Sequence, residues 1–333
     1  MSNIGVSVII TAYDRKDFVI QAIESVINQK YDPSSYEIIL VTNFNIDLTN
    51  YKVGCQLKSI LMDGSIGEFL YAGVLAATYS VIAFLDDDDT FEPMKLNRLV
   101  DVFSKNSKLC YYHNDVRYVD INNKPLDYVR LVEKKTSFSH GNNTIFDAET
   151  NFGSLKNVLE NRGDFNISSI AIRLECYMKY FSMLKEIKGT TDGFFFWTGL
   201  ISTGQLMIDD IKLTNYRIHN TNVSGKYDFI HKAIELRRQI YTYVLILRIL
   251  EQAKLVTEMD SAIKKWVLLY KYEYELMAEI FGKSPRILIL RSFWKILDIG
   301  HHYSNTLKRR ILLLGVIALI SKNYVRIIYS LVR

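Results

Sequence analysis

The chain has little proline, glycine or cysteine: four prolines, sixteen glycines and three cysteines in 333 residues. So few prolines and glycines argue against long disordered linkers, and the sequence shows no internal repeat or low-complexity tract. The cysteines, Cys55, Cys110 and Cys176, are odd in number, widely spaced and not arranged as CxxC. We therefore expect neither a zinc site nor a disulfide framework, and a reducing cytoplasmic setting.

The sequence also has no hydrophobic run long enough to cross a bilayer. The C-terminal run of ten residues at 311–320 is about half of the roughly 20 that a spanning helix needs. The first five residues carry no basic region or cleavage site, so we expect no signal peptide. Basic residues flank 311–320, which favours two interpretations of residues 305–333 equally: a helix in a membrane interface, or one packed on the preceding domain or on a second subunit of a homodimer.

Charge is unevenly distributed along the chain. Residues 1–224 carry 22 Lys and Arg against 27 Asp and Glu, whereas residues 225–333 carry 19 against 9. A basic tail behind an acidic body indicates an anionic partner, either nucleic acid or membrane lipid. The tail is rich in Leu and Ile and contains no recognisable nucleic-acid module, so we expect no nucleic-acid partner and a peripheral location at the cytoplasmic membrane face.

Strand and helix patterns alternate in the first part of the chain. Four runs predict strands, namely residues 5–11, 36–42, 56–61 and 80–85. Apolar residues at helical spacing predict helices at 18–27 and 66–78. This order predicts a doubly wound, mostly parallel α/β sheet. Because helical patterns dominate from residue 225, we divide the chain into an α/β domain (1–224) and a helical C-terminal region (225–333).

The later elements of the α/β domain are less regular in pattern. We expect a helix at 95–103, strands at 109–112, 116–121 and 167–173, a helix at 194–202, and a strand pair or extended segment at 206–216. Residues 133–165 are polar and predict a loop with a short helix near 155–159.

Four consecutive carboxylates at residues 86–89 directly follow the predicted strand 80–85. Side chains at the carboxyl ends of central strands face the crevice where α/β sheets bind ligands. Hard oxygen ligands suit Mg²⁺ or Mn²⁺ carrying a nucleotide diphosphate. The alternative is a solvated acidic turn that caps the next helix.

Four segments together resemble glycosyltransferase family 2 in their order and spacing: residues 11–15 (TAYDR), 22–29 (AIESVINQ), 37–41 (EIILV) and 84–89 (FLDDDD). The resemblance covers about residues 5–225. It implies a GT-A fold and transfer of a sugar, with inversion, from a nucleotide-diphosphate donor to an acceptor hydroxyl on a lipid-linked or surface glycan. It also implies a Mn²⁺ or Mg²⁺ cofactor, because a bound cation neutralises charge on the departing diphosphate.

The resemblance assigns roles to residues of the donor site. Thr11 and Tyr13 would contact the nucleotide base and ribose. Asp86 and Asp87 would hold the ribose or order the site, and Asp88 would bind the metal, with Asp86 as a further candidate ligand.

Two further residues are candidates for chemistry. Asp192, in the segment 189–197 (GTTDGFFFW), would be the general base that an inverting displacement needs; otherwise it offsets a helix dipole. His219, in the segment 216–219 (YRIH), resembles the family's closing motif and would meet the diphosphate or metal. Its alternative is a structural hydrogen-bonding residue.

The sequence departs from the family pattern at two places. Thr42 and Asn43 stand where an acidic pair reads the base, although the Asn43 amide can still bond to uracil or guanine. Leu70 and Tyr71 replace an Arg-Asn pair that contacts the donor. These departures support an alternative, a degenerate, non-catalytic GT-A domain that acts as a binding subunit of a glycan assembly complex. A nucleotidyltransferase is disfavoured, because residues 11–16 contain no glycine for a phosphate loop.

Overall fold

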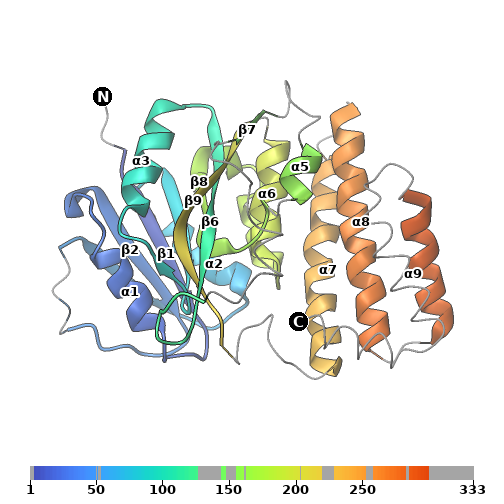
Figure 1. The fold of residues 1–333 in the computed structure, drawn as a ribbon, viewed down its shortest axis with the longest axis horizontal. Helices are drawn as coiled ribbons and strands as arrows, with labels where there is room; N and C mark the ends of the chain where they lie inside the picture. Colours follow the sequence, from blue (N-terminus) through green and yellow to red (C-terminus); the bar gives the residue numbers. More distant parts are fainter. Residues whose placement is uncertain are drawn as a thin grey trace. The chain divides into compact units, whose positions relative to one another are not determined.

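The computed structural model describes residues 4–49, 51, 54–126, 144–147, 155–160, 163–202, 204–219, 229–252, 258–282 and 285–299. The chain forms two compact units, Met1–Ile187 with Thr191–Asn222, and Lys188–Thr190 with Val223–Arg333 (Figure 1). The predicted loop at 133–165 lies largely outside the described residues, and the predicted interfacial helix at 305–333 lies wholly outside them.

The first unit is built on one mixed sheet, whose described strands follow the order β3-β2-β1-β4-β8-β6-β9-β5, with β7 beside β9. The strands are β1 (Val6–Ala12), β2 (Tyr36–Thr42), β3 (Gln56–Leu61), β4 (Val81–Asp86), β5 (Thr90–Phe91), β6 (Leu109–Val119), β7 (Thr144–Asp147), β8 (Ile170–Arg173) and β9 (Gln205–Arg217). The α-helices in the described part of this unit are α1 (Val19–Ile27), α2 (Ile66–Leu75), α3 (Lys95–Lys105), α5 (Leu155–Glu160) and α6 (Thr191–Ile201).

The strands β1 to β4 confirm the predicted doubly wound, parallel arrangement. β1 lies between β2 and β4 and pairs with both in parallel. Thr11 is level with Val41 on one side and with Asp86 on the other. The carboxyl ends of these strands therefore meet at one edge of the sheet, where the aspartate run begins.

Helices cover both faces of the sheet (Figure 1). On the face of Val8 and Ile10, the buried sides of α1 and α3 join the same hydrophobic core. On the other face, α2 approaches so closely that a Cβ at Gly73 would lie 2.5 Å from Ile9 Cγ2. Burial on both faces explains why the central strands are continuously apolar rather than alternating.

Beyond β4 the sheet departs from the simple parallel pattern. β8 runs antiparallel to both β4 and β6, and β9 runs parallel to β6. The two strands predicted at 109–112 and 116–121 form one long β6, which is paired to β9 with register shifts. The predicted strand at 167–173 begins with a 3₁₀ turn, Ile167–Ser169, before β8.

Cys110 and Cys176 form a disulfide, so the expectation of no disulfide is wrong. The two cysteines are 66 residues apart, and their spacing gives no hint of pairing. β6 pairs antiparallel with β8, with Tyr111 opposite Ile172. This pairing brings Cys176 close to Cys110. Cys55 remains a free thiol. Cysteine usage therefore no longer supports a reducing compartment.

The second unit consists, in its described part, of the helices α7 (Phe229–Gln252), α8 (Glu258–Phe281) and α9 (Arg286–Ile299), which lie side by side (Figure 1). Their facing sides bury apolar side chains, among them Ile246, Ile263, Val267 and Ile289. Tyr243 of α7 stacks on Tyr270 of α8 with ring centroids 5.7 Å apart. Over the described residues, no helix combines the length and apolar character needed to cross a membrane.

Candidate functional site

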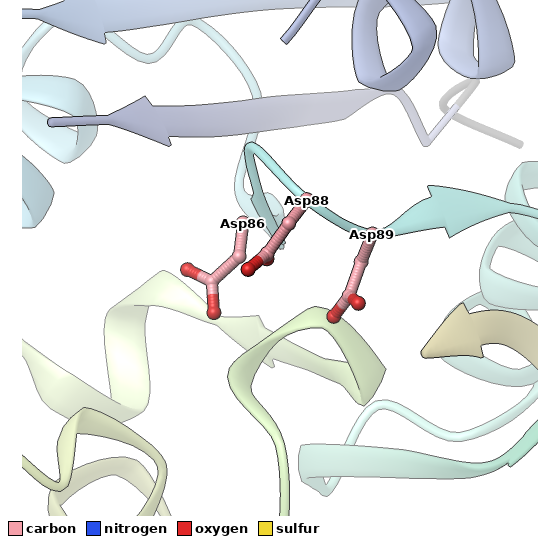
Figure 2. Close-up of side chains that lie close together, drawn as sticks. All are labelled: Asp86, Asp88 and Asp89. Carbon is pink, nitrogen blue, oxygen red and sulfur yellow. The ribbon is translucent and has the colours of Figure 1, made fainter. Parts of the chain in front are cut away.

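Three aspartates converge where β4 ends. Asp86 is the last residue of β4, and Asp88 and Asp89 lie in the turn before β5. One carboxylate oxygen from each of the three lies within 4.8 Å of the others. Figure 2 shows the three side chains on the same side of the turn. Convergent carboxylates of this kind, here called the aspartate triad, are suitable ligands for Mg²⁺ or Mn²⁺.

The backbone of this turn is anchored from two directions. The Asp86 N–H donates to Ser168 Oγ at 3.0 Å. Arg217, at the end of β9, donates its backbone N–H to Asp89 Oδ1 at 3.0 Å and its Nε to the Asp88 carbonyl at 2.8 Å. The Arg217 side chain is buried and donates further to backbone carbonyls, so its role here is to fix the turn.

Asp87 pairs with Arg15, in the loop after β1. Arg15 Nε donates to Asp87 Oδ2 at 3.1 Å, and Nη2 donates to Asp87 Oδ1. Arg15 Nη1 also donates to Asp88 Oδ2 at 2.6 Å. His219 Nε2 lies 3.0 Å from the same Asp88 oxygen, so the structure brings predicted residues Asp88 and His219 together.

The aspartates carry more negative charge than their neighbours neutralise. Burial and the surrounding carboxylates raise the pKa of Asp86 well above its ordinary value, and burial together with Asp88 raises the pKa of Asp87 and of Asp89 to about 7. Burial also acts to raise the pKa of Asp88, but the hydrogen bond with His219 and the charge of Arg15 bring it below its ordinary value. A divalent cation would relieve this repulsion, so these residues fit the metal that the sequence predicts.

Asp192 lies in the first turn of α6, as expected. Its Oδ2 accepts the backbone N–H of Asn166 at 3.1 Å, and its Oδ1 accepts that of Gly193 at 2.9 Å. The side chain of Asn166 in turn donates to Asp89 Oδ2 at 3.3 Å. Asp192 is therefore connected to the aspartate triad through a single residue, Asn166, and its carboxylate is held in a defined orientation.

The model of glycosyl transferase family 2 matches residues 63–163. An uncharacterized glycosyltransferase of Nostoc sp. is 34% identical over 142 residues, which is 40% of this chain and 42% of that protein. The succinoglycan biosynthesis protein ExoO of Rhizobium meliloti is 27% identical over 168 residues, 47% of this chain and 48% of that protein. Residues 63–163, which include the aspartate run, are thus similar to glycosyltransferase family 2. The chain's matches span just under half the length of these two relatives.

The fold of the chain is the GT-A fold. It is similar to S. aureus TarS residues 1–349, whose crystal structure contains UDP-GlcNAc, with a TM-score of 0.54, 12% identity and 89% coverage of each chain. A second TarS crystal structure gives a TM-score of 0.59 with 11% identity, covering 96% of this chain and 54% of that one. At such low identity the likeness establishes the fold alone.

The other predicted donor residues lie at the ends of β1 and β2. Thr11 Oγ1 donates to Asp86 Oδ1 at 3.4 Å. Asn43 and Asp14 form a reciprocal pair, in which Asn43 Nδ2 donates to Asp14 Oδ1 at 2.7 Å and the Asp14 N–H donates to Asn43 Oδ1 at 2.9 Å. Tyr13 is 49% exposed. Thr11 and Asn43 are thus held in place, while the Tyr13 ring is available to a ligand.

Sequence reasoning missed several residues of this site. Asp89 stands in the run already noted, and its membership in the triad depends on the turn geometry. Arg15 lies in the segment 11–15, and its positive charge could have been predicted to pair with the acidic run at residues 86–89. Asn166 and Ser168 gave no signal, because their contacts with the aspartates join residues about 80 positions apart.

Proposed function

We propose that this protein is a family 2 glycosyltransferase, metal-dependent and inverting, that moves a sugar from a nucleotide-diphosphate donor to an acceptor hydroxyl. The observation that carries the proposal is the aspartate triad at the carboxyl end of β4, where one oxygen from each carboxylate lies within 4.8 Å of the others. In a GT-A fold this is the edge of the sheet at which ligands bind.

The donor would be held by residues at the ends of β1, β2 and β4. Asp88 and Asp86 would bind Mn²⁺ or Mg²⁺, which neutralises charge on the diphosphate as it leaves. Thr11, Tyr13 and Asn43 would contact the base and ribose. Asp87 would order the site through its ion pair with Arg15. His219 would face the diphosphate from the Asp88 side.

Asp192 would act as the general base. As it takes the proton from the acceptor hydroxyl, a bond forms between the acceptor oxygen and the anomeric carbon. The bond from that carbon to the phosphate oxygen breaks, its electron pair leaves with the diphosphate, and the anomeric configuration inverts. The two backbone N–H donors to Asp192 support this role, because a base must keep a fixed direction toward the proton that it removes.

The acceptor in this proposal is a lipid-linked or surface glycan. The name of the R. meliloti relative, a succinoglycan biosynthesis protein, supports that class. The basic and apolar sequence of residues 305–333 supports peripheral attachment to the cytoplasmic membrane face. Deletion of residues 305–333 should then release the protein from anionic liposomes, and unchanged co-sedimentation would oppose the attachment.

Calorimetric titration with UDP, GDP, UDP-GlcNAc and further sugar conjugates, in Mn²⁺ and in EDTA, tests the donor site and identifies the base. UDP-GlcNAc is the first conjugate to use, because TarS was crystallised with it. Metal-dependent binding with donor turnover supports a transferase. Binding without turnover on any acceptor would favour the non-catalytic binding subunit, which the replacements at Asn43 and Tyr71 suggest. Absence of binding would exclude the donor site.

A further inference from the structure

Asn166 makes a hydrogen bond to both halves of the proposed active site. Its backbone N–H donates to Asp192 Oδ2 at 3.1 Å, and its side-chain Nδ2 donates to Asp89 Oδ2 at 3.3 Å. Its side-chain Oδ1 accepts the N–H of Ser168 at 3.0 Å. Each polar atom of the amide is therefore engaged, and the residue is 6% exposed.

The segment that carries Asn166 is fixed to the sheet on both sides of it. The Phe165 carbonyl accepts from His113 Nε2 at 2.6 Å. The Ser168 carbonyl accepts from the buried Lys95 Nζ at 2.5 Å and from Thr214 Oγ1 at 3.0 Å. Asn166 itself has a φ of 66°, in the left-handed region that Asn tolerates better than most residues. The segment is therefore a rigid support rather than an adaptable loop.

We propose that Asn166 is a positioning residue that fixes Asp192 relative to the aspartate triad. The inference rests on the proposed function and deepens it: Asn166 joins a candidate metal ligand, Asp89, through its side-chain amide to the candidate base, Asp192, through its backbone N–H. The two carboxylates belong to elements far apart in sequence, the β4–β5 turn and α6, and Asn166 forms a hydrogen bond with each of them.

The chemistry of inverting transfer explains why such a link matters. The base must approach the acceptor on the side opposite the departing diphosphate, so its distance from the metal site sets the geometry of attack. A misplacement of about 1 Å can cost about 100-fold in rate. Hydrogen-bond partners of metal ligands typically contribute about 10- to 100-fold to metal affinity or activity.

The variant Asn166→Gly isolates the side chain. Glycine accepts the positive φ and keeps the backbone N–H that donates to Asp192, but it removes the amide that donates to Asp89. Asn123→Gly is the control for glycine at a positive φ, because Asn123 has a φ of 62° and lies in an exposed turn, and its side chain accepts from Thr90 Oγ1 at 3.3 Å rather than bonding to an aspartate.

We expect Asn166→Gly to weaken Mn²⁺ affinity, measured by calorimetry with UDP, by about 10-fold. We also expect kcat for UDP-GlcNAc hydrolysis at saturating Mn²⁺ to fall by at least about 10-fold, because added metal cannot restore the position of the base. Asn123→Gly should match the wild type in both. A purely structural role would lower the unfolding midpoint and leave saturated kcat unchanged, and that result would overturn the proposal.

A second variant covers the case in which Asn166→Gly shows no cooperative unfolding transition. Asn166→Asp keeps the oxygen that accepts from Ser168 and loses the donor to Asp89. Saturated kcat must still fall by at least about 10-fold, and wild-type kcat in this variant would overturn the proposal. A wild-type protein that binds no nucleotide with Mn²⁺ would instead overturn the proposed function and this inference with it.

Discussion

The two compact units differ in what they bury. The described buried side chains of the α/β unit include many charged ones: Glu37, Asp87, Asp88, Asp89, Lys95, Asp115, Arg173, Asp209 and Arg217. In the described part of the helical unit, the buried polar side chains are Thr242 and Ser292, which carry no charge. Burying a charged side chain costs free energy unless the charge is paired. The buried charged side chains of the α/β unit are therefore not explained by packing alone.

Two acidic sites within the α/β unit sharpen this contrast. Asp209 is a single carboxylate matched by Arg98 Nε at 2.8 Å and by the Tyr112 hydroxyl at 2.9 Å, as expected of a structural ion pair. The turn at residues 86–89 instead places four carboxylates beside one directly paired guanidinium, that of Arg15. Mismatched buried charge of this kind indicates a site for a cation.

The change with the largest expected effect is Asp88→Ala. It removes the carboxylate that both His219 and Arg15 approach, and metal-dependent donor binding should be lost altogether. Calorimetry with UDP and Mn²⁺ measures this directly. Asp101→Ala, on the surface of α3, is the control and should bind as the wild type does. Unchanged metal-dependent affinity in Asp88→Ala would remove the site from this turn.

Asp192→Asn separates binding from chemistry in the same unit. An amide cannot take the acceptor proton, so turnover should fall by about 100- to 10,000-fold while donor affinity stays within a few-fold. Steady-state kinetics beside calorimetry tests both halves of this expectation, with Asp101→Asn as control. Retained turnover would mean that another group is the base.

Much of this arrangement was predictable from local pattern. The alternating runs around β1, β2 and β4 fixed the parallel core, and the position of residues 86–89 after an apolar strand located the acidic edge. Local pattern failed where long-range pairing decides. Asn166 reaches Asp89 across 77 residues, and Cys110 reaches Cys176 only through the pairing of β6 with β8.

The disulfide offers a way to change the stability of one unit and not the other. It closes a separation of 66 residues, and loop entropy assigns such a link about 4 kcal/mol. Cys110→Ser should therefore increase amide hydrogen exchange in β6 and β8 and leave α7 and α8 unchanged. Cys55→Ser is the control, because Cys55 forms no disulfide. Equal loss of protection in both units would show that they unfold together.

The smallest expected effect is a pH dependence of stability that belongs to the aspartate turn. The pKa of Asp89 is raised from 3.8 to about 7 by burial and by Asp88, so its protonated form stabilises the fold. That contribution is fully present below the unfolded pKa and is lost as pH rises through about 7. Asp89→Asn cannot titrate, so in EDTA its urea midpoint relative to the wild type should rise between about pH 4 and pH 7 and then level off. A constant difference across that range would mean that Asp89 is not protonated near neutral pH. The turn would then carry less unneutralised negative charge than its four carboxylates suggest.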